Sequence, residues 1–294
     1  MNNKPIVSVC MITYGHEDYI GEAIDGVLMQ ITDFDVELVI SNDCSPDKTD
    51  LEVKKYLGID HGRVTINYIK LEKNIGMIPN FIFALEKCRG KYIVMCEGDD
   101  YWIDEHMLQK QVDFLEKHNT YNLVTGYVKQ YVQSTGEFIG SKEKKAYDFT
   151  YKDMIIRNQC STCATMIRNF IKDNGFNYAD DMGSDSQLWI RALGSDGLGR
   201  KMEAEFAVYR RHDDSFTFKR TLTKTPYESG IQFMKAKIKR ARFWNDYFGN
   251  TAKASVLQVE KTMYKRMAKA AYKTKDLKGL LKFGFSYTKA RLSL

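Results

Sequence analysis

The sequence lacks any long apolar run. No stretch of about 18 or more consecutive apolar residues, the length that a membrane-spanning helix needs, occurs among its 294 residues. The first residues, MNNKPIVSVC, also lack the basic and then apolar order of a secretory signal. We therefore expect a cytoplasmic protein that does not cross a membrane.

Two nucleotide-binding motifs are absent as well. No G-x-G-x-x-G follows the first predicted strand, and no G-x-x-x-x-G-K-[ST] occurs anywhere in the sequence. This argues against a dinucleotide fingerprint and against a phosphate loop. The six cysteines include one CxxC pair, Cys160 and Cys163, but no second pair or set of histidines at zinc-ligand spacing accompanies it. Any phosphate group that binds here must be held by other means.

Charge is divided unevenly along the chain, although the formal net charge is only +6. Residues 219–294 carry 19 Lys and Arg against 4 Asp and Glu, which leaves 25 of the 44 basic and 34 of the 38 acidic residues for 1–218. A basic tail of this kind is typical of a region that meets polyanions or anionic membrane surfaces. We predict a domain over residues 1–218 and a basic helical C-terminal region over residues 219–294.

Strand-like apolar runs alternate with amphipathic helical segments in the first part of the chain. Repeated β-α units of this length predict an α/β fold, with a mostly parallel sheet and helices on both faces. The predicted strands are 5–13, 36–41, 64–70 and 91–95, and the predicted helices are 19–30, 47–57 and 78–88.

Polar clusters follow each of these strands, and the ligands of such sheets bind at the carboxyl ends of the strands. The clusters are TYGHED (13–18), SNDCSPDKT (41–49), EKNIG (72–76) and EGDD (97–100). Turns and helix caps use the same residue types, and for SPDKT the cap is the favoured interpretation. The carboxylates of EGDD are suited to a hard cation, Mg²⁺ or Mn²⁺, that bridges to the oxygens of a diphosphate.

At these segments the sequence resembles the family 2 inverting glycosyltransferases, which have the GT-A nucleotide-sugar-binding fold. The resemblance is carried by VSVCMITYGHEDYIGEAIDGVLMQ, ELVISNDCSPDKT and NIGMIPNFIFALEKCRGKYIVMCEGDD, and it extends from about Val7 to His212. It implies a GT-A (Rossmann-like) domain that binds a nucleoside-diphosphate sugar.

The resemblance also implies roles for residues on the nucleotide side. Thr13 and Tyr14 match the turn that stacks on the nucleobase, and Asp43 matches the aspartate that reads the edge of the base. Asp99 and Asp100 match the pair that divides between ribose and metal. The chain departs from the commoner VDD pattern, because its second strand ends in SND.

On the acceptor side, MGSDSQLWIRAL matches the segment that supplies the general base, and Asp185 takes that position. An aspartate before an amphipathic helix is also a favoured N-cap, so both interpretations stay open. AVYRRHDDSFT matches the strand end whose histidine approaches the metal or diphosphate, which implies His212 beside Arg210 and Arg211.

The chemistry follows from the bond to be broken. Cleavage of a sugar–phosphate bond puts negative charge on the leaving diphosphate, so the site needs a cation there and a base at the incoming hydroxyl. A single displacement from the opposite face inverts the anomeric centre.

Two further segments between these motifs have strand-like patterns. Residues 124–140 are expected to form a hairpin and residues 160–167 another strand. Together they are expected to form the floor of the pocket on its acceptor side. The aromatic residues Tyr101, Trp102 and Trp189 are candidates for sugar stacking, although core packing is the commoner role of such residues.

The basic tail shows helical spacing, with one apolar stripe from Ile231 to Phe248 and a second from Val256 to Met267. Such helices either pack with a solvated basic face or lie on an anionic membrane. Nucleic acid is not expected as a partner, because no recognised nucleic-acid motif accompanies the charge.

The sequence therefore predicts an inverting glycosyltransferase that uses Mn²⁺ or Mg²⁺ and a UDP or dTDP sugar as donor. The acceptor is predicted to be a glycan or a lipid-linked saccharide in surface polysaccharide assembly, with the protein cytoplasmic or peripheral on the inner face of the membrane. A catalytically silent nucleotide-sugar or glycan-binding protein and a nucleotidyltransferase are the alternatives.

Overall fold

The computed structural model describes residues 4–140, 143–174, 185–212 and 226–293. Two compact units make up the chain: Met1–Asp148 with Cys160–Arg211, and Phe149–Gln159 with His212–Leu294. The predicted domain boundary at residue 218 lies outside the described residues. Each unit is described by itself below.

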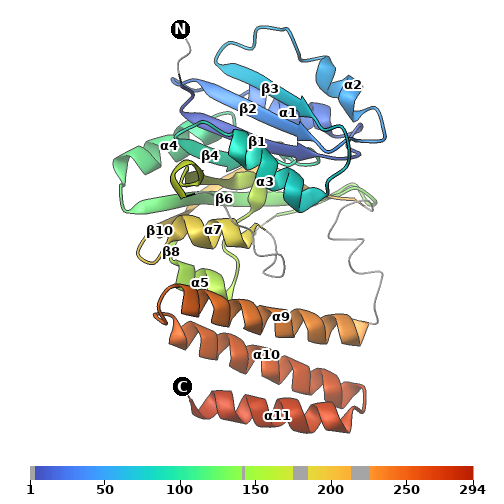
Figure 1. Ribbon diagram of the computed structural model, residues 1–294, viewed down its shortest axis with the longest axis vertical. Helices are drawn as coiled ribbons and strands as arrows, with labels where there is room; N and C mark the ends of the chain where they lie inside the picture. Colours follow the sequence, from blue (N-terminus) through green and yellow to red (C-terminus); the bar gives the residue numbers. More distant parts are fainter. Residues whose placement is uncertain (1–3, 141–142, 175–184, 213–225, 294) are drawn as a thin grey trace. The chain divides into compact units, whose positions relative to one another are not determined.

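The first unit begins with the β-α alternation that the sequence predicts. Strands β1 to β4 form the parallel part of the sheet in the order β3-β2-β1-β4, and Figure 1 shows β1, β2 and β3 side by side. The elements are β1 (Val7–Thr13), α1 (Ile20–Leu28), β2 (Val36–Asn42), α2 (Thr49–Lys54), β3 (Val64–Lys70), α3 (Met77–Lys87) and β4 (Tyr92–Met95). All seven elements are confirmed, with ends shifted by a few residues at most.

The sheet continues past β4 with strands that come from later in the chain, in the order β9-β6-β10-β5. β9 is antiparallel to both β4 and β6, whereas β6 and β10 are parallel. The elements are β5 (Tyr101–Trp102), α4 (Met107–Lys117), β6 (Tyr121–Val132), β7 (Glu137–Ile139), β8 (Tyr147–Phe149), β9 (Thr165–Arg168), α6 (Ile171–Asn174), α7 (Ser186–Leu193) and β10 (Leu198–Arg211).

The predicted hairpin is confirmed as the antiparallel pair β6 and β7. β6 and β9 are inner strands of the central sheet, and their predicted role on the acceptor side stays a prediction. Long-range pairing of β9 between β4 and β6 determines this arrangement, and the local pattern of 160–167 does not encode it.

Both faces of the sheet are covered by helices. Alternate residues of β1 (Val7, Val9, Met11) belong to one apolar cluster with the buried faces of α1 and α4. The helix α3 packs against β1 and β2, where Ser41 donates a hydrogen bond of 2.5 Å to Asn80. The sheet is therefore the middle layer of three, as predicted for an α/β fold.

A buried polar network holds the start of β4 to the sheet. The Ser8 hydroxyl donates to Glu37 at 2.5 Å and accepts from the Gly90 N–H at 2.7 Å. Glu37 also accepts from the Arg89 guanidinium at 2.8 and 2.9 Å. The buried carboxylate is thus satisfied by several donors, as a buried charge requires.

The second unit is helical, with α5 (Tyr151–Ile156), α9 (Pro226–Tyr247), α10 (Lys253–Lys273) and α11 (Leu277–Leu292). α10 packs against α9 on one side and α11 on the other, and the three long helices lie one beside the next in Figure 1. Their apolar stripes are buried against one another, including Met234, Ala241, Val259 and Met267. Among the described residues, no helix combines the length and apolarity needed to span a bilayer.

Candidate active site

The loops at the carboxyl ends of β1 and β2 are joined by hydrogen bonds. The Gly15 N–H donates to Ser45 at 3.1 Å, and the His16 N–H donates to Thr49 at 2.9 Å. The Glu17 N–H donates to Asp47 at 3.0 Å. The polar residues of SPDKT thus connect two strand ends, and they do more than begin α2.

Asp43, the predicted base-reading residue, is buried at the end of β2. Its two carboxylate oxygens accept from the N–H groups of Ile75 and Gly76, at 2.7 and 2.9 Å. Asn42, which stands where the family more often has an acidic residue, accepts from both the N–H and the hydroxyl of Ser45. The side chains of SND therefore fix the loops after β2 and β3.

Thr13 and Tyr14, predicted to meet the nucleobase, lie at the end of β1. The Tyr14 side chain is 48% exposed, which leaves its ring open to a stacking partner. The hydroxyl of Thr13 is buried and has no hydrogen-bond partner within the described residues. Both roles stay predictions.

The acidic loop, residues 97–100, follows β4 and is fixed through its backbone. The Gly98 N–H donates to the Ile12 carbonyl at 3.0 Å, so the loop lies beside the end of β1. The side chain of Asp99 comes within 3.9 Å of the His16 ring. The loop therefore presents carboxylates next to the predicted nucleobase turn.

The carboxylates of the acidic loop repel one another. Burial, followed by the charges of Asp99 and Asp185, raises the pKa of Glu97 to about 8. Burial and the charges of Asp99 and Glu97 also raise the pKa of Asp100 well above its ordinary value. Carboxyl groups held this close favour a proton or a cation between them.

A divalent cation fits these residues. Oδ1 of Asp100 accepts from the Arg210 N–H at 2.9 Å, while Oδ2 is buried and lacks a hydrogen-bond partner among the described residues. No group of three or more His, Cys, Asp or Glu in the described part of the chain forms a preformed metal site. Mg²⁺ in particular is often held by one or two carboxylates together with waters and substrate phosphates, so the loop suits a cation that arrives with a diphosphate.

Asp185, the predicted base, caps α7. Its Oδ1 accepts from the Ser186 N–H at 2.9 Å, and its Oδ2 accepts from the Thr162 hydroxyl at 2.5 Å. Ser184, which could cap the helix instead, and Asp180 and Asp181, the next candidates for a base, lie outside the described residues. Asp185 is linked to the region of the acidic loop, because Thr162 donates to it and the carbonyl of the next residue, Cys163, accepts from Trp102, two residues after the loop. Capping and catalysis are compatible here.

Arg210 holds the acidic loop in place, a role that the sequence did not reveal. Its Nε donates to the Asp99 carbonyl at 3.0 Å, and its guanidinium also pairs with Glu22. The guanidinium carbon lies 4.9 Å from the centre of the Tyr19 ring and 5.3 Å from that of Tyr101. These contacts position the acidic loop, and the suitability of Arg210 and Arg211 for a departing diphosphate stays a prediction.

The remaining predicted residues are placed as follows. Trp102 and Trp189 are buried in the core and are not placed to stack on a sugar. The indole N–H of Trp102 donates to the Cys163 carbonyl at 2.7 Å. Neither Cys160 nor Cys163 forms a disulfide with a described residue. His212 directly follows β10 and is grouped with the second unit, so its predicted role as a ligand stays a prediction.

The class of protein that this fold and site define is an α/β protein with a ligand site at the carboxyl ends of its parallel strands. Comparison with known proteins makes this specific. Residues 8–175 match the family described as Glycosyl transferase family 2. The chain belongs to this family.

Relatives and solved structures agree with this assignment. The chain is 33% identical to the uncharacterised Mycobacterium tuberculosis protein Rv1520 over 217 residues, which are 70% of this chain and span only 59% of that protein. It is 26% identical over 214 residues, 71% of this chain and 79% of the relative, to an Escherichia coli protein named UDP-Glc:alpha-D-GlcNAc-diphosphoundecaprenol beta-1,3-glucosyltransferase WfaP.

Among solved structures, S. aureus TarS residues 1–349 in complex with UDP-GlcNAc superimposes with a TM-score of 0.61. The match covers 96% of this chain and 91% of TarS at 17% identity, which shows a shared fold. The predicted GT-A fold class is confirmed.

Proposed function

We propose that this protein is an inverting glycosyltransferase that moves a sugar from a UDP or dTDP sugar to a glycan or lipid-linked saccharide. The observation that carries the proposal is the hydrogen bond from Thr162 to Asp185, because the carbonyl of the next residue, Cys163, accepts from Trp102, two residues after the acidic loop. This link supports a base candidate near the candidate phosphate-side carboxylates. Membership of Glycosyl transferase family 2 supports it independently.

On the donor side, Tyr14 supplies an exposed ring for the base, with Thr13 beside it. Asp43 is assigned to the base edge and Asp99 to the ribose. Asp100 and His212 are the proposed ligands of Mn²⁺ or Mg²⁺, which when bound would offset the negative charge of the diphosphate. The choice of a uridine or thymidine nucleotide is supported by TarS, which was solved with UDP-GlcNAc.

On the acceptor side, Asp185 takes the proton of the incoming hydroxyl. A general base has to lie within about 2.6–3.2 Å of the hydroxyl oxygen or act through one water. The hydrogen bond from the Thr162 hydroxyl fixes the carboxylate orientation before substrate binds. No covalent intermediate is needed, since the base activates the acceptor for attack from the face opposite the diphosphate.

A lipid-linked acceptor in surface polysaccharide assembly fits the name of WfaP, which specifies a diphosphoundecaprenol-linked sugar. The basic residues of 219–294 support a cytoplasmic protein that is peripheral on the inner face of the membrane.

The test is nucleotide release from UDP and dTDP sugars with lipid-linked and free saccharide acceptors, followed by NMR assignment of the product anomer. We expect transfer with inversion, dependent on Mn²⁺ or Mg²⁺. Retention of configuration, or donor binding without transfer to any acceptor that carries the matching hydroxyl, would contradict the proposal.

A further inference from the structure

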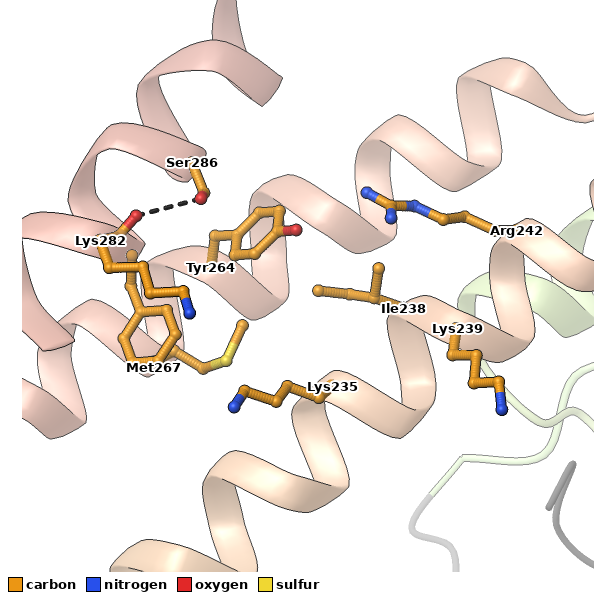
Figure 2. Close-up of a pocket in the computed structure, with 9 residues that line it drawn as sticks. Lys235, Ile238, Lys239, Arg242, Tyr264, Met267, Lys282 and Ser286 are labelled. Carbon is orange, nitrogen blue, oxygen red and sulfur yellow. Dashed lines mark hydrogen bonds between the residues drawn. The ribbon is translucent and has the colours of Figure 1, made fainter.

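A pocket of about 310 Å³ lies between α9, α10 and α11 of the second unit (Figure 2). Part of its lining is apolar, with Ile238 from α9, Met267 from α10 and Phe283 from α11. All three side chains are buried in the helix packing. The pocket is therefore built by the whole three-helix arrangement and not by one loop.

Its polar lining is cationic. Lys235 on α9 and Lys282 on α11 point their amino groups toward one another across the pocket, as Figure 2 shows. Within the described residues, no carboxylate pairs with either of them. Arg242, by contrast, is already bonded to Glu260 at 2.6 Å. Two unpaired ammonium groups that converge beside an apolar surface repel each other, and an anion placed between them removes that repulsion.

An exposed apolar ridge runs along the outer side of α11. Leu277, Leu281 and Phe285 are 72%, 77% and 74% exposed, although the buried side of the same helix packs on α10. They recur every four residues, so they share one face of the helix. Exposed large apolar side chains in a row indicate an interaction surface.

A row of lysines lies between this ridge and the pocket. Lys278, Lys282 and Lys289 share one flank of α11 by their spacing, and Lys282 also lines the pocket. Across the helix the order is thus apolar ridge, lysine row and cationic pocket. A bilayer presents a matching order, with acyl chains first and the negatively charged phosphates beyond them.

We propose that the pocket binds the phosphate of an anionic phospholipid in a bilayer, with the α11 ridge entering the boundary of the acyl chains. The inference deepens the membrane association proposed above and is independent of the donor site, which belongs to the first unit. Charge complementarity and the position of the ridge beside the pocket favour a bilayer over a soluble phosphate ester.

Flotation with phosphatidylglycerol-containing vesicles tests this inference, with the double variant Lys235→Gln/Lys282→Gln in the full-length chain. Each lysine near an anionic surface contributes enough that losing two should weaken binding about 10–30-fold. The matched control is Lys265→Gln/Lys269→Gln, which removes the same charge from exposed positions on the side of α10 opposite Met267. We expect this control to lose less than about a third as much vesicle binding as the pocket variant, because screening weakens charges that lie away from the bilayer.

Equal losses of vesicle binding in the two lysine variants would overturn the assignment of the pocket as the phosphate site, because general electrostatic attraction would then explain the binding. A second pair, Leu281→Ser/Phe285→Ser, removes exposed side chains that the fold does not need and should also abolish flotation. If inorganic phosphate at constant ionic strength displaces the protein while this ridge variant floats normally, the site serves soluble phosphates and the bilayer assignment fails. A wild-type protein that never floats also overturns it.

UDP-dependent thermal shifts of the same variants, measured with Mn²⁺, separate this inference from the proposed transferase function. They should match the wild-type shifts, because the pocket lies outside the first unit. Failure of UDP binding in the wild type would count against the proposed function and leave the flotation result standing.

Discussion

Replacing Glu97 by glutamine is expected to stabilise the metal-free protein at about pH 8 and to change its stability little at about pH 5. Glutamine resembles the protonated form of the side chain. Folding raises the pKa of Glu97 from 4.5 to about 8, so the folded chain keeps a proton that the unfolded chain releases. This contribution to stability is complete below pH 4.5 and is lost as the pH rises through about 8.

The size of the effect follows from the same pKa. A pKa difference of one corresponds to about 1.4 kcal/mol, so going from about pH 5 to about pH 8 removes at most ~4 kcal/mol. Partial exposure of the side chain and sharing of the proton with neighbouring carboxyls reduce this to ~2–3 kcal/mol. For a domain of this size, that corresponds to a melting-temperature change on the order of 5–10 °C.

The assay is thermal unfolding at both pH values in the presence of a chelator. The control is Glu86→Gln on α3, which removes an exposed carboxylate outside the acidic loop. Glu97→Gln should melt above the wild type at the higher pH only, and Glu86→Gln should follow the wild type throughout. A Glu97→Gln protein with the wild-type pH dependence would refute the argument that the loop carries a shared, displaceable proton.

Four other substitutions test the site and the fold. Asp100→Ala should abolish the Mn²⁺-dependent part of UDP binding, whereas Asp99→Ala should weaken UDP binding with or without metal. In thermal melts, wild type with UDP at a hundred times its dissociation constant should gain about 2.7 kcal/mol, and an equal gain without Mn²⁺ would contradict the metal assignment. Gly90→Ala should destabilise by about 1–3 kcal/mol, because its Cβ would lie 2.5 Å from the Ser8 backbone nitrogen. Gly230→Ala on α9 meets nothing within 4 Å, so it should stabilise slightly, by about 0.5–1 kcal/mol; similar melting of the two would refute the clash.

The parallel half of the sheet was predictable because its information is local. Each of β1 to β4 is a short apolar run followed by turn residues, and each helix has a continuous apolar face. The place of β9 between β4 and β6 was not predictable in this way, because an inner antiparallel strand is specified by partners far away in the chain.

The site was predictable in position and less so in detail. The rule that ligands bind at the carboxyl ends of strands located the acidic loop. The role of Arg210 in positioning the acidic loop was not predicted, because its contacts with Glu22 and Asp99 join residues far apart in sequence. The raised pKa of Glu97 was not predictable, since it depends on burial that only the fold provides.

The tail was correctly predicted to be helical and basic, but its apolar stripes turned out to be buried among α9, α10 and α11. Packing is therefore the correct interpretation of those stripes. The exposed ridge of α11 was overlooked, although the spacing of Leu277, Leu281 and Phe285 is visible in the sequence. Sequence periodicity shows that a face is apolar, and the tertiary structure decides whether that face is covered.

The most direct measurement of the proposed function is the rate of sugar transfer by Asp185→Asn. Asparagine keeps the size of the side chain, and its oxygen can still accept from the Ser186 N–H while its amide group donates to the Thr162 hydroxyl, but it cannot take a proton. Donor binding should survive, while transfer should fall by about 10²–10⁴, the usual loss when a general base is removed. Asp196→Asn, an exposed position in the loop after α7, is the matched control and should transfer at the wild-type rate. A wild-type rate in Asp185→Asn would contradict the assignment of Asp185 as the base, and with it the proposed mechanism.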